Sequence, residues 1–199
     1  MSEYYLNKYR IPSARLKNWN YASDAMYFIT ICTQAREHYF GHIKNGMMCL
    51  SMAGQMVHRF WAEVPNHFPN VRLWEFVVMP DHMHGVVEII SGGGTNICGA
   101  TNIRRDVVLQ RLYGGCRDII GPPKNQHFAK LSPKPGSLPT VIRSFKSICT
   151  REINAKFPDL EFAWQPRYHD HVIRNRDEYK RIARYIIQNP VRWKIRGLD

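Results

Sequence analysis

Two histidines stand two residues apart inside an otherwise apolar stretch. The stretch VVMPDHMHGVVEII covers residues 77–90 and contains His82 and His84. Because side chains alternate across a β-strand, these two imidazoles would share one face of a strand and could converge on one metal ion. The H-x-H spacing also arises by chance, and the ordinary alternative is a polar edge position or a histidine satisfied by a local hydrogen bond. The spacing therefore makes the pair a candidate metal site.

A tyrosine and an asparagine near the end of the chain form a second constellation. Tyr185 and Asn189 lie four residues apart in RYIIQNP, so on a helix they stand one turn apart on the same face. Asn189 could then serve as a neutral oxygen ligand and Tyr185 as an oxygen nucleophile. The alternative is a tyrosine packed under a sheet and an asparagine that ends the helix before Pro190.

A further H-x-H pair competes with the first. His169 and His171 follow Tyr168 in the stretch YHDH. The two histidines could act as metal ligands, and Tyr168 could act as the nucleophile. The helical spacing of Tyr185 and Asn189 gives both of those groups a role, which favours Tyr185 over Tyr168.

The elements that would position these residues follow a recognisable order. Apolar runs rich in β-branched and aromatic residues predict strands, amphipathic periodicity predicts helices, and Asn45-Gly46 predicts a hairpin. The strands are expected at 25–34, 70–79, 82–90 and 161–174, the helices at 51–68, 137–157 and 175–189, the last one stopped by Pro190. Without the hairpin and the last helix, the order is β-α-β-β-α-β. This predicts an α+β, ferredoxin-like (RRM-like) antiparallel sheet with helices on one face, plus a C-terminal helix that carries the tyrosine.

The chain length suits one domain with additions. We expect a basic N-terminal arm at 1–24, a single domain at 25–193 and a tail at 194–199. Gly and Pro cluster at both ends of 91–139, which indicates a flexible insertion within the domain. No apolar run reaches the length of a membrane span, and the N-terminus lacks a signal-peptide core, so the expected location is cytoplasmic.

The charge of the chain points to a polyanionic partner. Lys and Arg number 28 against 16 Asp and Glu, a formal net charge of +12. A field of this sign on a small domain favours nucleic acid or an anionic membrane, and we expect nucleic acid and no membrane. The alternative is a solvated basic surface. The five scattered cysteines contain no C-x-x-C pair, which argues against a disulfide framework or a zinc knuckle.

Three blocks of sequence together resemble a known family. MPDHMHG after a hydrophobic strand, WQPRYHDHVIRN about eighty residues later and YIIQNP near the end resemble the REP-associated tyrosine transposases. These are single-strand transposases of the HUH endonuclease superfamily, in which U is a hydrophobic residue. The resemblance covers most of the chain from Tyr27 to Trp193, and the insertion at 91–139 is the part that it supports least.

The resemblance implies roles for individual residues. His82 and His84 would be the metal ligands, with Met83 as the hydrophobic U, and Tyr185 would be the nucleophile. Asn189 would sit where the family carries a polar residue beside the metal. The family also has a histidine in a supporting role at the position of His171. The resemblance further implies a ferredoxin-like fold, a homodimer and a substrate of single-stranded DNA next to hairpins.

This chemistry predicts a DNA endonuclease and strand transferase. Attack by the Tyr185 oxygen would leave a 5′-phosphotyrosine and a free 3′-OH, so the bond energy is conserved and rejoining needs no ATP. A divalent ion would stabilise the charge of the transition state. Mg²⁺ prefers oxygen ligands whereas Mn²⁺ accepts imidazole more readily, so we expect either ion to support activity, with Mn²⁺ at least as good.

The remaining basic and aromatic residues would bind the DNA. Five arginines and one lysine, on or just after the last two expected helices, are expected to contact phosphates, with a salt-dependent affinity. Trp164, Tyr168 and Trp193 are candidates for base stacking, although core packing explains each of them equally well. The expected phosphate contacts are Arg143, Lys146, Arg151, Arg181, Arg184 and Arg192.

Two other classes of function stay open from the sequence. A non-catalytic single-stranded nucleic-acid-binding module of RRM-like topology would share the fold, but the central strands lack its aromatic pattern. A metal-dependent hydrolase could use His82, His84 and Asp81, but it would need further ligands that the sequence does not offer.

Overall fold

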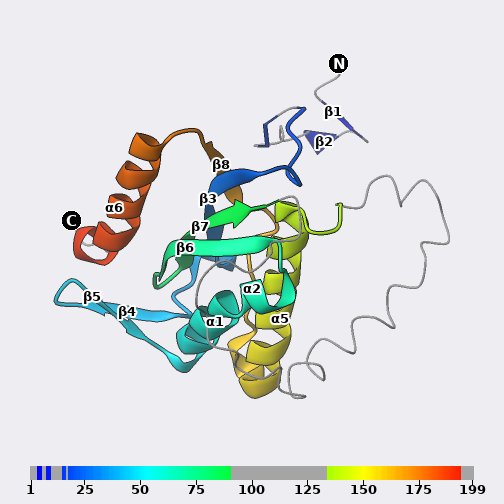
Figure 1. Ribbon diagram of the computed structural model, residues 1–199. Coiled ribbons are helices and arrows are strands. Elements are labelled where there is room, and N and C mark those ends of the chain that lie inside the picture. Colours follow the sequence, from blue (N-terminus) through cyan, green and yellow to red (C-terminus); the bar gives the residue numbers. More distant parts are fainter. Residues whose placement is uncertain (1–3, 6–7, 10–14, 17, 91–133, 194–199) are drawn as a thin grey trace.

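A computed structural model of the protein describes residues 4–5, 8–9, 15–16, 18–90 and 134–193 (Figure 1). The insertion expected at 91–139 lies outside the described residues up to position 133, as does the expected tail at 194–199. The expected arm at 1–24 is described only in parts. These parts include the short antiparallel strands β1 (Tyr4–Tyr5) and β2 (Lys8–Tyr9). The division into arm, domain, insertion and tail therefore stays a prediction.

A four-stranded antiparallel sheet forms the centre of the fold. Its strands are β3 (Ala25–Cys32), β6 (Val71–Val78), β7 (His82–Ile89) and β8 (His169–Ile173). They lie in the order β6-β7-β3-β8, so the first strand along the chain lies between the third and the fourth. This is the ferredoxin-like arrangement that the sequence predicts. It puts the histidine strand β7 in the middle of the sheet.

The helices cover the two faces of this sheet unequally. Helices α1 (Met52–Ala62), α2 (Val64–His67) and α5 (Leu138–Lys156) lie on one side of the sheet and α6 (Arg176–Arg192) lies on the other (Figure 1). The larger core lies on the α1–α5 side and contains Met83 and Val87 from β7. On the opposite face Val86 packs against Ile182 and Ile186 of α6. Alternation along β7 therefore turns His82 and His84 toward α6.

Local sequence signals account for most of the element ends. The Asn45-Gly46 turn joins β4 (Gly41–Lys44) to β5 (Met47–Leu50), and both turn residues have positive φ, as a two-residue hairpin of this kind requires. The Ser51 hydroxyl caps α1 by accepting from the Gly54 amide at 3.1 Å. Asn175 caps α6 by accepting from the Glu178 amide at 2.9 Å.

Three expected elements differ from the structure. The first helix does not run unbroken to residue 68, because α1 ends at Ala62 and a separate short helix, α2, begins at Val64 with Pro65 in its first turn. The last strand is limited to His169–Ile173, since Pro166 has no amide to donate and only a single bridge, between Thr33 and Trp164, precedes it. Helix α6 also continues past Pro190 to Arg192, because a proline so near the end removes one hydrogen bond without preventing the last turn.

Candidate active site

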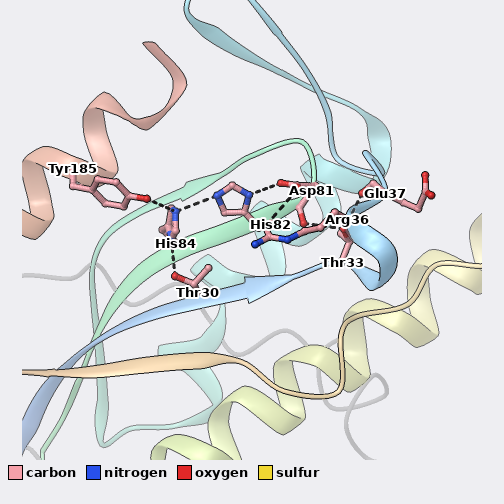
Figure 2. Close-up of polar contacts among 8 residues, drawn as sticks. All are labelled: Thr30, Thr33, Arg36, Glu37, Asp81, His82, His84 and Tyr185. Carbon is pink, nitrogen blue, oxygen red and sulfur yellow. Dashed lines mark hydrogen bonds and ion pairs between the residues drawn. The ribbon is translucent and has the colours of Figure 1, made fainter. Parts of the chain in front are cut away.

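The imidazoles of His82 and His84 face each other on strand β7. Their Nε2 atoms lie 3.1 Å apart, and both residues are buried, with 6% and 5% of their surface exposed. The close approach follows from their i, i+2 positions on one face of a central strand. The first expected H-x-H pair thus forms a convergent pair of nitrogen donors (Figure 2).

Each imidazole is oriented through its other ring nitrogen. The Nδ1 of His82 donates to Asp81 Oδ1 at 2.5 Å, and the Nδ1 of His84 lies 2.8 Å from the Thr30 hydroxyl. Thr30 reaches His84 because the two residues are paired across β3 and β7. Since the Asp81 carboxylate can only accept, His82 carries a proton on Nδ1, and its Nε2 is directed toward His84.

Burial and nearby charge keep this site free of protonated imidazole at His84. Burial, followed by the charges of His82 and Arg36, lowers the pKa of His84 to about 3. Burial alone would raise the pKa of Asp81, but the hydrogen bond with His82 and the charges of His82 and Arg36 lower it below its ordinary value. His84 therefore meets the requirement that a metal ligand be deprotonated near neutral pH.

Tyr185 reaches the same point from helix α6. Its hydroxyl lies 3.2 Å from Nε2 of His84, while 43% of the residue remains exposed to solvent. The ring makes edge contacts with Phe28 and with the His84 imidazole. Ile186, the next residue, is almost fully buried under α6 and anchors this part of the helix. The phenol oxygen is thus held beside the histidine pair, on a side chain that is partly exposed to solvent.

Asn189 lies on the same stripe of the helix. Residues 185, 189 and 193 follow at intervals of four, so their side chains line one face of α6 and its cap. Tyr185 contacts the His84 ring, and the Trp193 ring lies 5.6 Å from the His82 ring. Asn189 lies between these two contacts along the helix, and only 8% of it is exposed. No hydrogen bond from Asn189 to either histidine is present in the structure described.

The donor set fits a divalent ion. Two nitrogens bound to one ion at about 2.1 Å stand roughly 3 Å apart when they occupy neighbouring positions, which matches the His82–His84 separation. A carboxylate and a hydroxyl beside the two Nδ1 atoms are the kind of groups that orient metal-bound histidines. Within the described ranges no group of three or more His, Cys, Asp or Glu is arranged to hold a metal.

The competing residues lie elsewhere. Tyr168 packs against the larger core and accepts a hydrogen bond from Arg15, and burial raises its pKa well above the ordinary value. His169 lies on β8 and pairs with Thr30 of β3, so the strand β3 separates it from His84. His171 Nε2 is 2.8 Å from Glu178 at the start of α6. Among the described residues, no hydrogen bond or ring contact joins Tyr168, His169 or His171 to the histidine pair.

The basic residues expected to bind DNA divide between two surfaces. Those on α5 border an open groove of about 590 Å³ whose lining includes Trp164. Lys146 there donates to the carbonyls of Gln165 and Pro166, and Arg151 contacts Glu152. The α5 group is Arg143, Lys146 and Arg151, and the α6 group, exposed on the side of the histidine pair, is Arg181, Arg184 and Arg192.

The sequence patterns do not reveal the roles of three supporting residues. The sequence offers Asp81 only as a candidate ligand, yet its carboxylate lies on the Nδ1 side of His82, away from the facing Nε2 atoms. Thr30 could have been found only from the register of β3 against β7. Arg36 belongs to no motif. Its Nη1 lies 3.4 Å from Asp81 Oδ2 because of a turn that no sequence pattern predicts.

Comparison with known proteins identifies relatives of the chain. It is 35% identical over 183 residues to an uncharacterised protein from Haemophilus influenzae, covering 92% of this chain and 89% of that protein. The chain therefore belongs to the same family as this Haemophilus protein. No family model matches the sequence.

Two solved structures are also similar to this chain. One is a REP-associated tyrosine transposase bound to a REP hairpin, with 19% identity, a TM-score of 0.49 and coverage of 96% of this chain and 73% of that chain. The other is a candidate transposase from Deinococcus radiodurans R1, with 14% identity, a TM-score of 0.43 and coverage of 88% of this chain and 98% of that chain.

Proposed function

We propose that this protein is a tyrosine transposase: a metal-dependent endonuclease and strand transferase that cuts and rejoins hairpin-associated single-stranded DNA. The observation that carries the proposal is the meeting of three groups from two distant parts of the chain. The Tyr185 hydroxyl lies 3.2 Å from His84, whose Nε2 lies 3.1 Å from that of His82. A nucleophile beside two metal-binding nitrogens is the minimum equipment for this reaction.

The covalent step would use Tyr185 as the nucleophile. Its oxygen attacks the scissile phosphorus, the Tyr185 O–P bond forms, and the bond from phosphorus to the 3′ oxygen breaks. The phenol proton passes to solvent, which the exposed side of Tyr185 allows, and the departing 3′ oxygen takes up a proton. In the reverse step a 3′-OH attacks the phosphotyrosine, so the strand is rejoined without an external energy source.

His82 and His84 would hold the divalent ion, with Asn189 as a neutral oxygen ligand. When bound, Mg²⁺ or Mn²⁺ neutralises charge on the scissile phosphate and orients it for in-line attack. Asp81 and Thr30 keep both Nε2 atoms directed at the same point. Two imidazoles suit Mn²⁺ better than Mg²⁺, which supports Mn²⁺ as at least an equal cofactor.

The two groups of basic residues would contact different parts of the DNA. The α6 group, Arg181, Arg184 and Arg192, is on the side of the sheet that carries Tyr185 and would hold the strand near the cut. The α5 group lies on the other side and would contact a more distant part, such as the hairpin stem, through its phosphates. Arg143 is the best placed of that group because it is exposed, whereas Lys146 donates to two backbone carbonyls and Arg151 contacts Glu152.

The structure disfavours the two rival functions. An RRM-type module binds single strands on an open sheet face, whereas here α6 packs onto that face through Ile182 and Ile186. A hydrolase that used Asp81 as a third ligand would need its carboxylate beside the Nε2 atoms. Instead the two Asp81 oxygens contact His82 Nδ1 and Arg36.

A covalent adduct would test the proposal. The protein is incubated with labelled single-stranded hairpin DNA, beginning with hairpins that flank its own gene, and Mn²⁺ or Mg²⁺. We expect a protein–DNA adduct that survives denaturation and is abolished by EDTA. Hairpin binding that EDTA does not affect, without cleavage of any substrate, would favour the binding module. Light scattering would test the homodimer that belongs to the same proposal.

A further inference from the structure

A turn with unusual backbone geometry borders the histidine site. Residues Ala35 and Arg36, in the turn that follows β3, both adopt left-handed conformations, with φ of 52° and 62°. Such values are uncommon for residues other than glycine, and here they occur in succession without a glycine. A backbone of this kind persists only where the surroundings fix it, and it is often retained for what it positions.

The surroundings of this turn are the residues that precede β7. The amide of Thr33 donates to the Asp81 carbonyl at 2.9 Å, and the Phe40 amide donates to the Pro80 carbonyl at 3.1 Å. The Thr33 hydroxyl, which is fully buried, lies 2.8 Å from the carbonyl oxygens of both Glu37 and Asp81. The turn after β3 is therefore joined to the segment that leads into the histidines.

The consequence of this geometry is the position of one guanidinium. Figure 2 shows the Arg36 side chain reaching Asp81 from the turn, while the neighbouring Glu37 side chain points away. Arg36 Nη1 lies 3.4 Å from Asp81 Oδ2, and the other carboxylate oxygen accepts from His82 Nδ1. The side chain of Asp81 is 6% exposed, so its charge has little water to solvate it, whereas that of Arg36 is 38% exposed.

We infer that Arg36 is a positioning residue of the histidine site: by holding Oδ2 of Asp81, it keeps Oδ1 on His82 Nδ1 and so fixes the direction of His82 Nε2. Its relevance to catalysis rests on the proposed function. The positional effect itself does not, because the contacts join Arg36, Asp81 and His82 without DNA or metal. A buried carboxylate with one oxygen released would rotate, and the imidazole that it orients would lose its fixed aim.

A matched ion pair on the same sheet supplies the control. Arg72 Nη1 also lies 3.4 Å from a carboxylate, that of Glu88, at the end of the sheet away from the histidines. Arg36→Gln and Arg72→Gln therefore remove the same group at the same distance. Any difference between the two variants at His82 then reports the position of Arg36 and not the loss of a surface charge.

The test is an NMR measurement of the His82 ring in metal-free protein labelled with ¹⁵N-histidine. The Nδ1 proton held by Asp81 should give a downfield, slowly exchanging signal, assigned by its loss in Asp81→Asn. We expect Arg36→Gln to broaden or lose this signal and Arg72→Gln to retain it. An unchanged signal in folded Arg36→Gln would overturn the inference. If that variant does not fold, Arg36→Lys replaces it. Faster exchange of the His82 Nδ1 proton in Arg36→Lys would support the inference, and an unchanged exchange rate would overturn it.

Metal titration adds a second measurement. If the histidine pair binds Mn²⁺, Arg36→Gln should weaken the affinity for Mn²⁺ about tenfold, the lower end of the range for residues that support metal ligands by hydrogen bonds. Arg72→Gln should leave this affinity unchanged. Equal affinities of Arg36→Gln and the wild type would count against the inference. Failure of the wild type to form a DNA adduct would refute the proposed function while leaving the NMR result to decide the role of Arg36.

Discussion

The hydroxyl of Tyr185 lies 3.2 Å from Nε2 of His84, although the two residues are 101 positions apart in the chain. Helix α6 packs on the sheet face that carries both histidines, which is how residues from the middle and the end of the sequence meet. The ring of Tyr185 contacts His84 and Phe28, so its oxygen is fixed by packing as well as by the hydrogen bond. This contact defines the candidate site.

Anchoring of α6 can be tested with two neighbouring isoleucines. Ile186 is 1% exposed and Ile187 is 66% exposed. We expect Ile186→Ala to lower the free energy of unfolding by about 2–4 kcal/mol, because it removes buried methyl groups and leaves a cavity between α6 and the sheet. Ile187→Ala should change it by less than about 0.5 kcal/mol. Urea denaturation of both variants measures this, and equal effects would contradict the packing described.

The histidine pair predicts a specific loss of metal binding. His84→Ala should weaken Mn²⁺ binding by at least about 100-fold, because one of two nitrogen donors is removed. His42→Ala, which removes an exposed histidine from the hairpin, should leave the affinity unchanged. Titration followed by EPR of free Mn²⁺ gives both values. A wild-type protein that binds Mn²⁺ no more tightly than His84→Ala would show that the pair is not a metal site.

The neutral state of His84 predicts a pH dependence of stability in the metal-free protein. Burial, with the charges of His82 and Arg36, lowers its pKa to about 3, whereas an unfolded histidine titrates near about 6.5. Above pH 6.5 the folded and unfolded states bind equally few protons at this residue. As the pH falls from 6.5 toward 3, the unfolded state is protonated first, so the stability contributed by neutral His84 is lost.

Urea denaturation in EDTA at pH 7, 6 and 5 would measure this effect. The free energy of unfolding should decline more steeply in the wild type than in His84→Asn. His42→Asn, at an exposed position, should decline as the wild type does. Parallel declines of the wild type and His84→Asn would show that His84 is not held in its neutral form by burial.

The groove on α5 predicts a contact with DNA that is separate from cleavage. Arg143→Gln should weaken hairpin binding several-fold and reduce the slope of log affinity against log salt by about one, because one phosphate contact is lost. Cleavage of a short single strand without a stem should be unaffected. Arg59→Gln on α1 serves as the control. Identical salt slopes for the wild type and Arg143→Gln would exclude Arg143 as a phosphate contact.

The order of elements and the faces of β7 could be predicted because both depend on local patterns. Alternation along residues 82–89 assigns Met83 and Val87 to the main core and the two histidines to the other face, as the structure has them. The helix limit at Pro190 was wrong because the local penalty of one proline was outweighed by the remaining turn of α6. Local patterns set limits to elements less reliably than they set their order.

The supporting residues could not be predicted because they depend on contacts between distant segments. Thr30 and His84 are 54 positions apart in the chain and lie side by side only because of the register of β3 against β7. Arg36 reaches Asp81 only through the left-handed turn that Thr33 joins to the start of β7. A sequence shows residue types and spacing, whereas these contacts are set by strand pairing and by the shape of a turn.

The central claim is that Tyr185 becomes linked to DNA, and one comparison of variants tests it directly. Tyr185→Phe retains the ring that packs on Phe28 and His84 but lacks the nucleophilic oxygen, and Tyr168→Phe makes the same change at the competing tyrosine. With single-stranded hairpin DNA and Mn²⁺, we predict that Tyr185→Phe forms no denaturation-resistant adduct. Tyr168→Phe should form it as the wild type does, with the phosphotyrosine mapped by mass spectrometry to residue 185. An adduct that persists in Tyr185→Phe and disappears in Tyr168→Phe would contradict the assignment.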